Sequence, residues 1–379
     1  MLNPEEKIIA LLKKHGVNFT ASLPCEKVKT LLEMVEMDFY HVPLTREEEG
    51  VGIAAGAALT GRRPALFVQS SGIGNMINAL LSLTAFYELP LALFVSRRGV
   101  YKEKIEAQFP MGRRLPGILT GAGISYSEIN TVEDINIVDR ELPEAFIKNK
   151  IHAFLLSPAI WEGSVSGARE AKSMVQETKD ARHDSMPTRH HPLAPMLTRY
   201  DILKLIASFI DNKVTVCNLG IPSKELYAVK HQPSNFYMLG SMGMVTPVGL
   251  GIALTSKKEV FVIEGDGSLL MNPGTLATAA ALAPSNLTII TIDNAAYGST
   301  GNQPTLAGAC VDLEHVALGF GFRNTVKIAA PQEIVDVMRK PRQDLSFIHV
   351  IARVGNKDVP NIPIHHLAIK KAFQDFLAR

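Results

Sequence analysis

The stretch that decides the fold is EVFVIEGDGSLLMNPGTLATAAALAPSNLTIITIDNAAYGSTG, residues 259–301. Its first run, 259–263, is short, apolar and β-branched, which is typical of a strand buried on both faces of a parallel sheet. A helix is expected from Asn272, which is followed by a proline, and a second apolar run, 287–292, predicts another strand. The stretch therefore predicts a βαβ unit with two parallel strands.

Two polar residues, Asp266 and Asn294, directly follow these two strands. If the strands are neighbours, their carboxyl ends stand roughly 5 Å apart at one edge of the sheet, where open α/β sheets bind ligands. One carboxylate and one amide oxygen suit a hard cation that keeps further positions for diphosphate oxygens. For Asp266 alone, a helix cap in a tight turn is an equally good interpretation.

The order of features GDG, MN, helix and DNAAYG resembles the cofactor motif of the thiamine-diphosphate-dependent 2-oxoacid decarboxylases. The resemblance implies that Asp266, the Asn294 side chain and the main-chain oxygen of Ala296 bind a divalent cation: magnesium, or another such as calcium or manganese. The first residue of the usual Asn pair is Asp293 here. The residues that the resemblance places at the thiamine diphosphate are Glu47, Gly240, Met242, Gly265, Asp266, Gly267, Ser268, Asn294 and Gly298.

Composition sets broad limits on the protein. The chain has 379 residues, enough for two ordinary domains, and a net charge of +2, which does not predict a nucleic-acid partner. Its 3 cysteines are far apart and form no metal-binding spacing, which fits a reducing cytoplasm. No apolar run has membrane-spanning length and no signal peptide is visible, so we expect a cytoplasmic protein without a membrane partner.

Short apolar runs alternate with helical segments along most of the chain. This alternation predicts an α/β fold of two doubly wound parallel-sheet domains, residues 1–161 and 199–379. Residues 162–198 are polar and proline-rich, which predicts a linker too short to contain a middle domain. By resemblance, the first domain would be the pyrimidine-binding (Pyr) domain and the second the diphosphate-binding (PP) domain of a thiamine enzyme.

The segment LTREEEGVGIAAGAALTGR, 44–62, carries three consecutive glutamates. Thr45 and Glu48 fit a capping box, and on spacing alone all three acids could be structural. The segment resembles the cofactor-activating segment of thiamine enzymes, in which a glutamate stands nine positions before a glycine. Counting back from Gly56 gives Glu47 as the catalytic residue, with Glu48 as the fallback.

The stretch LGSMGMVTP, 239–247, places Met242 between small residues. A methionine in the core is the ordinary interpretation. By resemblance, the residue at this position lies beneath the cofactor and bends it.

The strings QSSGIGNMINAL, 69–80, and SRRGVYKEKIEAQFPMGRR, 96–114, carry the evidence on substrate. The first lacks the third glycine of a dinucleotide fingerprint and resembles a turn of the phosphonopyruvate and sulfopyruvate decarboxylases. The second is expected to be a loop whose cations are either solvated or bind a substrate with two anionic ends. The candidate substrate-binding residues are Ser71, Asn75, Arg97, Arg98, Lys102 and Gln108.

Taken together, TREEEGVG, SSGIGN, RRGVYKEKIEAQ, GSMG and DNAAYGSTGNQPT resemble the sulfopyruvate decarboxylase family, with its two halves fused in one chain. The resemblance implies decarboxylation of 3-sulfopyruvate to sulfoacetaldehyde, a step toward coenzyme M, by a homodimer or higher homo-oligomer with active sites at the subunit interface. A phosphonopyruvate decarboxylase is the nearest alternative, and the loop lysines favour the sulfonate. From other classes, a non-catalytic thiamine-diphosphate-binding protein and an NAD-dependent dehydrogenase remain alternatives.

Overall fold

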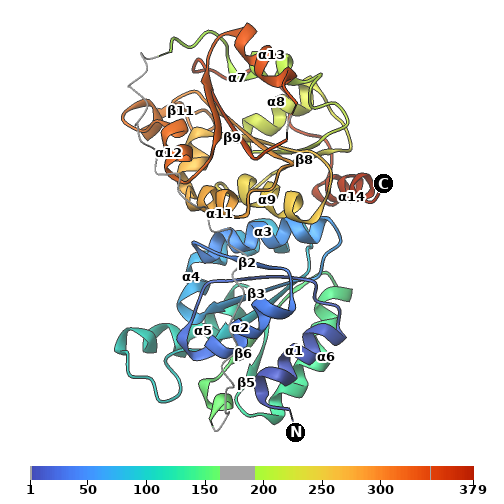
Figure 1. The fold of residues 1–379 in the computed structure, drawn as a ribbon, viewed down its shortest axis with the longest axis vertical. Coiled ribbons are helices and arrows are strands. Elements are labelled where there is room, and N and C mark those ends of the chain that lie inside the picture. The colour runs from blue at the N-terminus through green and yellow to red at the C-terminus, as the bar shows by residue number, and fades with distance from the viewer. Residues whose placement is uncertain (1, 163–192, 342) are drawn as a thin grey trace. The chain divides into compact units, whose positions relative to one another are not determined.

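A computed structural model describes residues 2–162, 193–341 and 343–379 (Figure 1). The chain divides into two compact units, Met1–Ser173 and Met174–Arg379. Most of the expected linker, from 163 to 192, lies outside the described residues.

Unit 1 contains a six-stranded, fully parallel sheet in the order β2-β1-β3-β4-β6-β5. Its strands are β1 (Phe19–Ser22), β2 (His41–Pro43), β3 (Pro64–Gln69), β4 (Leu91–Ser96), β5 (Ser125–Ile129) and β6 (Ile151–Leu156). Its helices are α1 (Pro4–Lys14), α2 (Lys29–Asp38), α3 (Glu47–Leu59), α4 (Ser70–Ala79), α5 (Phe109–Gly121) and α6 (Asn136–Ile147). Its short helical segments are η1 (Glu26–Val28), η2 (Leu80–Ala85), η3 (Glu106–Gln108), η4 (Glu133–Ile135) and η5 (Pro158–Trp161).

Unit 2 contains a second six-stranded parallel sheet, in the order β13-β14-β10-β9-β7-β8. Its strands are β7 (Val214–Cys217), β8 (Asn235–Tyr237), β9 (Val260–Gly265), β10 (Leu287–Asp293), β13 (Asn324–Ile328) and β14 (Ser346–Ile351), with β11 (Ala296–Tyr297) and β12 (Gln303–Pro304) as a separate small hairpin. Its helices are α7 (Arg199–Ile206), α8 (Ile221–Val229), α9 (Val245–Thr255), α10 (Asp266–Met271), α11 (Gly274–Leu282), η6 (Leu306–Gly308), α12 (Leu313–Gly319), α13 (Pro331–Arg339) and α14 (His366–Leu377).

The two sheets have the same strand order when the strands of each are numbered from its own first strand. In each, the first strand lies between the second and the third, so the chain winds first to one side and then to the other. The predicted pair of doubly wound α/β domains is confirmed. This winding creates a switch point at the carboxyl end of the first strand, the place where such sheets bind ligands.

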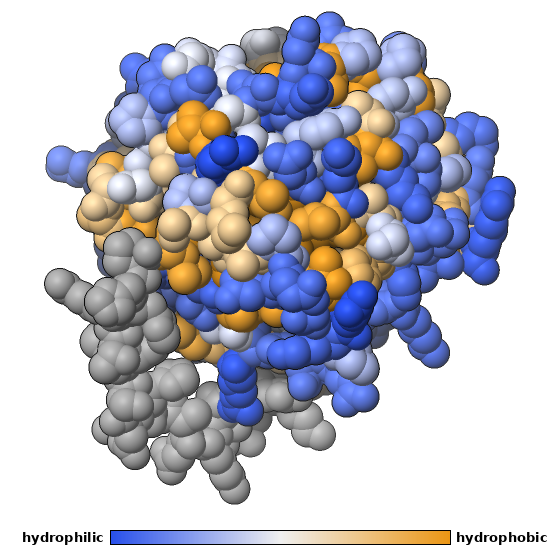
Figure 2. Space-filling model, turned by 90° about the horizontal axis from the view of Figure 1, so that it is seen from above, coloured by the Kyte–Doolittle hydropathy of each residue, from blue (hydrophilic) through white to orange (hydrophobic). Residues whose placement is uncertain are grey.

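Both cores are built from apolar strands buried on both faces. In unit 1, Phe67, Phe94 and Phe154 are register partners on β3, β4 and β6. Their rings stack with centroid distances of 5.0 and 4.9 Å. Stacked aromatic pairs contribute about 0.5–1.5 kcal/mol beyond their buried area, which favours this register over a slipped one. Large apolar side chains that reach the surface are interspersed with polar ones on the face drawn in Figure 2.

Several helices of the structure were not predicted from the sequence. The 96–114 segment is not a loop throughout, because α5 begins at Phe109, and α6 and α14 were not predicted at all. Prolines inside α5 and α6 weaken the helical sequence pattern without ending either helix. The helix expected from Asn272 is confirmed as α11, Gly274–Leu282, and a short helix that was not predicted, α10, precedes it from Asp266. Within the described ranges, no helix is both long and apolar enough to cross a membrane.

Candidate functional site

The two strands that define the site are neighbours, as predicted. Gly265 on β9 is the register partner of Ile292 on β10, so Asp266 and Asn294 both lie at the carboxyl edge of the unit 2 sheet. A pocket lies at this edge and extends over the end of β7, the switch-point strand. The predicted residues that line it are Met242, Gly265, Asp266, Gly267, Ser268, Asn294, Ala296 and Gly298.

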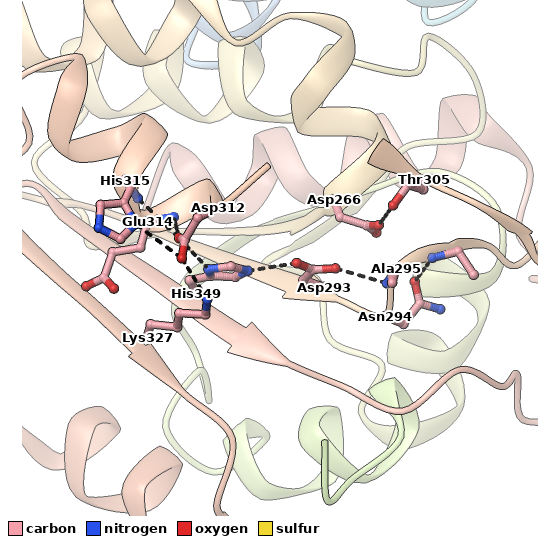
Figure 3. A network of polar contacts seen from close by, with 11 residues as sticks. Asp266, Asp293, Asn294, Ala295, Thr305, Asp312, Glu314, His315, Lys327 and His349 are labelled. Atoms are coloured by element: carbon pink, nitrogen blue, oxygen red, sulfur yellow. Dashed lines mark hydrogen bonds and ion pairs between the residues drawn. The ribbon is translucent and has the colours of Figure 1, made fainter. Parts of the chain in front are cut away.

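Asp266 is the carboxylate of this pocket. Its side chain is only 3% exposed and accepts a hydrogen bond from the Thr305 hydroxyl (Figure 3). Burial raises the pKa of Asp266 to about 6; the hydrogen bond from Thr305 opposes this shift and the negative charge of Asp293 adds to it. A buried acid beside a second acid is stabilised in its charged form by a bound cation.

The turn after β10 carries the other two predicted ligands. Ala295 has a left-handed backbone, with φ +54°, and its N–H donates to Oδ1 of Asp293 at 2.9 Å. The Thr305 N–H donates to the Ala295 carbonyl at 3.0 Å, which ties the turn to the segment that also holds Asp266. Nδ2 of Asn294 is buried and lacks a hydrogen-bond partner within the described part of the chain.

The donor set fits a hard cation. Among the described residues, no cluster of three or more His, Cys, Asp or Glu side chains could hold a metal. A cation at this pocket would therefore take one carboxylate, one amide oxygen and main-chain oxygen, with room for diphosphate oxygens. That is the chemistry of magnesium or calcium rather than of zinc.

Glycines allow neighbouring side chains to pack closely in the walls of the pocket. A Cβ on Gly267 would overlap the Tyr297 ring, and one on Gly298 would stand 2.5 Å from Oδ1 of Asn356. Ser268 accepts a hydrogen bond of 3.1 Å from the Gly243 N–H and so joins the GDGS and GSMG motifs.

Met242 is half-buried and lines the pocket. It stands between Ser241 and Gly243, both with positive φ. Gly240 precedes this pair of residues in the segment between β8 and α9. The tight turn thus directs the Met242 side chain to the pocket in which the cofactor was expected.

In unit 1, Glu47 lies in the first turn of α3. Glu47 is 5% exposed, and its Oε2 accepts a hydrogen bond of 3.0 Å from Nδ2 of Asn75 on α4. A Cβ on Gly72 would be 2.5 Å from Oε1 of Glu47, so the SSGIGN motif packs directly on this carboxylate.

The predicted capping box was wrong in its acid. Glu49, not Glu48, reaches back to cap α3, accepting from the Thr45 hydroxyl at 2.8 Å. Glu48 instead forms an ion pair with Arg46 at 3.5 Å. Burial raises the pKa of Glu48, and the positive charge of Arg46 opposes that shift. Of the three glutamates, Glu47 is the one that the SSGIGN motif holds, through the hydrogen bond from Asn75.

The candidate substrate cations are engaged within unit 1. Arg97 donates a hydrogen bond to Glu128 at 2.7 Å and another to the carbonyl of Gly112. This carbonyl has no helical partner, because Pro116, four residues later in α5, lacks a backbone N–H. Lys102 forms an ion pair with Glu162.

Arg98 forms a buried, two-pronged pair with Glu103, with distances of 2.6 and 2.9 Å. The hydrogen bonds from Arg98 lower the pKa of Glu103 to about 2 against the opposing effect of burial. Both charges of the pair are therefore satisfied internally.

The two remaining substrate candidates lie in α4 and η3. Ser71 accepts a hydrogen bond of 2.5 Å from Gln69, and Oε1 of Gln108 is buried without a partner in the described part of unit 1.

Comparisons with known proteins agree with this geometry. The family model described as thiamine pyrophosphate enzyme, N-terminal TPP binding domain, matches residues 3–113. The C-terminal TPP binding domain of the same enzymes matches residues 220–350. A sulfopyruvate decarboxylase of Methanosarcina acetivorans is 45% identical over 100% of this chain and 98% of its own length.

The chain belongs to the sulfopyruvate decarboxylase family of thiamine pyrophosphate enzymes. In Methanococcus maripaludis, members of this family are separate alpha and beta subunits, each 38% identical, which cover 42% and 48% of this chain. The prediction of two halves fused in one chain is therefore confirmed, as is thiamine diphosphate as the cofactor.

The chain is also similar to a second kind of decarboxylase and to a solved structure. A phosphonopyruvate decarboxylase of Streptomyces viridochromogenes is 31% identical over 93% of this chain and 89% of its own length. The crystal structure of benzoylformate decarboxylase from Polynucleobacter necessarius matches with a TM-score of 0.70 at 15% identity, covering 95% of this chain and 100% of that one. The latter shows the shared fold.

Several polar residues in or near the cation-binding turn were not predicted from the sequence. Thr305 was quoted within the GNQPT string, but its bond to Asp266 was not expected. His349 lies in a predicted apolar strand, and only its polarity among apolar neighbours could have drawn attention to it. Asn356 bridges Arg199 and the Gly298 carbonyl, at 2.9 and 2.7 Å, from a segment without any motif.

Proposed function

We propose that this chain decarboxylates 3-sulfopyruvate to sulfoacetaldehyde and carbon dioxide with thiamine diphosphate as cofactor. The observation that carries this proposal is the 45% identity, over the whole chain, to a sulfopyruvate decarboxylase, against 31% to a phosphonopyruvate decarboxylase. Lys104, an exposed residue of the loop after β4, adds weight, since a cation suits a substrate with two anionic ends.

In this proposal, unit 2 holds the diphosphate end of the cofactor. Asp266, the Asn294 side chain and the Ala296 main-chain oxygen bind magnesium or a similar divalent cation, which neutralises the diphosphate charge. Gly265 and Gly267 let the diphosphate approach the backbone, and Met242 lies under the cofactor rings. The burial of Asp266 supports the cation site, and the buried, unpartnered Nδ2 of Asn294 is a donor available to a diphosphate oxygen.

Unit 1 supplies the group that activates the cofactor. When bound, thiamine diphosphate supplies a carbanion that adds to the ketone and a ring that accepts the electrons left by carbon dioxide. Glu47 shares a proton with the ring nitrogen of the aminopyrimidine and so makes its exocyclic amine basic. Asn75 and Gly72 hold the Glu47 carboxylate in one orientation.

We also propose that the enzyme is at least a homodimer with its active sites at the subunit interface. The residues assigned to the two ends of the cofactor belong to two separate units. In the superfamily that the sequence resembles, those ends are bound by different subunits. Light scattering measures the molar mass of the purified protein. A monomeric mass for fully active enzyme would contradict this part of the proposal.

A competition experiment tests the substrate. Purified enzyme with magnesium and thiamine diphosphate receives 3-sulfopyruvate and 3-phosphonopyruvate together, and the two aldehydes are quantified beside released carbon dioxide. We expect sulfoacetaldehyde to dominate by at least tenfold in kcat/KM. Dominance of phosphonoacetaldehyde would favour the second candidate, which the 31% relative supports.

Release of neither aldehyde, with a positive thiochrome test for bound thiamine diphosphate, would leave only a binding function. Absence of both activity and bound cofactor would overturn the proposal entirely. The Asp266→Asn variant serves as the control that should lose metal-dependent turnover.

A further inference from the structure

A line of polar side chains leads away from the cation-binding turn across the sheet of unit 2. Asp293 ends β10, His349 lies on β14 and Lys327 on β13, while Asp312 is the N-cap residue of α12 (Figure 3). Thr291 and Lys327 are both register partners of His349. Residues in register, or two apart on one strand, share a face of a sheet, so these side chains all face the same way.

His349 is the centre of this line. It is 1% exposed, and its Nε2 lies 2.9 Å from Oδ2 of Asp293. Because a carboxylate only accepts hydrogen bonds, Nε2 carries the proton and donates it. Its Nδ1 is 3.8 Å from Oδ1 of Asp312 and has no hydrogen-bond partner among the described residues.

The far end of the line is fixed by charge. Asp312 accepts hydrogen bonds from Lys327 at 2.7 Å and from the backbone N–H groups of Glu314 and His315 at 3.0 and 3.3 Å. Burial alone would raise the pKa of Asp312, but the hydrogen bond from Lys327 and that from the His315 backbone lower it to about 2. An ionised, firmly held carboxylate therefore stands beside the His349 ring.

The near end of the line is the turn itself. Asp293 accepts a hydrogen bond from His349 on one oxygen and a hydrogen bond from the Ala295 N–H on the other. The left-handed backbone of Ala295 is unfavourable for a residue with a Cβ, so it needs such a contact to hold it. The carbonyl and side-chain oxygens on either side of Ala295 take their direction from that conformation.

We propose that His349 is a positioning residue for the cation-binding turn. By donating to Asp293 it fixes the carboxylate that holds Ala295, and through Ala295 it orients Asn294 and Ala296 toward the cation. The inference rests on the proposed function, since it assumes the cation site at Asp266 and Asn294. It also explains why an aspartate is accommodated at position 293: the histidine donates to its buried charge.

The test is Mn²⁺ binding, measured by electron paramagnetic resonance on the full chain with and without thiamine diphosphate. Removing a residue that orients a metal ligand costs about tenfold to a hundredfold in metal affinity. His349→Leu should weaken Mn²⁺ binding by at least about tenfold, whereas His349→Gln, whose amide can still donate to Asp293, should recover most of the loss. If His349→Leu does not fold, His349→Asn takes its place, because its shorter amide does not reach Asp293.

A matched control is His152, a buried histidine of unit 1 that lies between the hydroxyls of Ser125 and Ser127. His152→Leu removes the same ring from a core but should leave Mn²⁺ affinity unchanged. A drop in thermal stability without a change in Mn²⁺ affinity in the His349 variants would overturn the proposal, since it would show a purely structural role.

A double-mutant cycle tests the route. If His349 acts through Asp293, then His349→Leu should cost little further Mn²⁺ affinity in an Asp293→Asn background. An equal loss of Mn²⁺ affinity in the wild-type and Asp293→Asn backgrounds would show that His349 does not act through Asp293. Asp266→Asn separates the two proposals. If this variant still binds Mn²⁺, the assignment of the cation site is wrong. If it loses Mn²⁺ binding while the His349 variants keep it, only the role of His349 is wrong.

Discussion

Gly72 lies against the carboxylate of Glu47, so close that a Cβ at this position would stand 2.5 Å from both Cγ and Oε1 of the glutamate. Gly72→Ala should therefore displace Glu47 without disturbing α4, since alanine favours a helix over glycine. A catalytic group moved by about 1 Å can cost on the order of a hundredfold in rate. We expect such a loss in kcat with metal binding in unit 2 unchanged.

The same helix offers a control for this variant. Among the described residues, a Cβ on Gly74 would meet the Met111 methyl group alone, at 3.8 Å. Gly74→Ala should keep wild-type kcat, and equal effects of the two substitutions would contradict a specific contact between Gly72 and Glu47.

The hydrogen bond from Asn75 to Glu47 predicts a second effect. Hydrogen bonds to charged groups contribute about 1.5–3 kcal/mol, so Asn75→Ala should reduce kcat/KM by about tenfold to a hundredfold. Asn75→Asp should be worse, because it places a second carboxylate beside the first. Asn78→Ala, one turn further along α4, is the matched control, and steady-state kinetics with calorimetric cofactor affinity would distinguish activation from binding.

Glu47 and Glu48 can be separated directly. Glu47→Gln should bind thiamine diphosphate but lose about 10²–10⁴-fold in kcat, the range of a general acid or base. Glu48→Gln should lose only its ion pair with Arg46 and remain active. Loss of turnover in Glu48→Gln, with Glu47→Gln active, would reverse the assignment.

Much of the fold could be predicted because both sheets are parallel and buried. Strands such as Leu287–Asp293 are buried along their whole length and rich in β-branched residues, and the polar residue Asp293 marks the carboxyl end of this one. Most of the helices that were missed carry proline, as α5 does, or lie after the last strand, as α14 does, while α10 is only six residues long. Local sequence patterns register the lost N–H of a proline but not the packing that keeps a helix intact around it.

The site could be predicted only where its residues form motifs. Asp266 and Asn294 follow neighbouring strands, so the βαβ pattern alone brings them to one edge. The contact between Asn75 and Glu47 depends on how α4 packs on α3, and the line through His349 depends on the order β13-β14-β10. Neither the packing of two helices nor the order of non-consecutive strands can be derived from spacing along the chain.

The loop arginines are candidates for substrate binding or for solvated cations, and Arg98 is buried against Glu103. Breaking such a pair from either side leaves an unpaired buried charge and costs about 3–5 kcal/mol. Arg98→Met and Glu103→Gln should each destabilise the protein by about this amount, and the double variant should cost less than their sum. If Arg98 instead binds substrate, Arg98→Met would raise KM for 3-sulfopyruvate at least tenfold while Glu103→Gln would not.

His41 gives a prediction for stability against pH. It is 4% exposed, with its two ring nitrogens 2.9 Å from the Thr20 hydroxyl and 3.1 Å from that of Ser22. Burial lowers the pKa of His41 from 6.5 to about 4. Between these values the unfolded chain binds more protons than the folded one, so this contribution is complete above pH 6.5 and is lost as the pH falls toward 4.

The full loss amounts to about 3 kcal/mol, because one pKa unit corresponds to about 1.4 kcal/mol. Urea unfolding of wild type and His41→Gln between pH 7.5 and 4 would measure it as a shrinking difference in stability. Burial also raises the pKa of Glu264 to about 7, which acts in the opposite sense, but that effect is common to both proteins and cancels in the difference. A difference that stays constant across the range would show that His41 takes up its proton without unfolding cost.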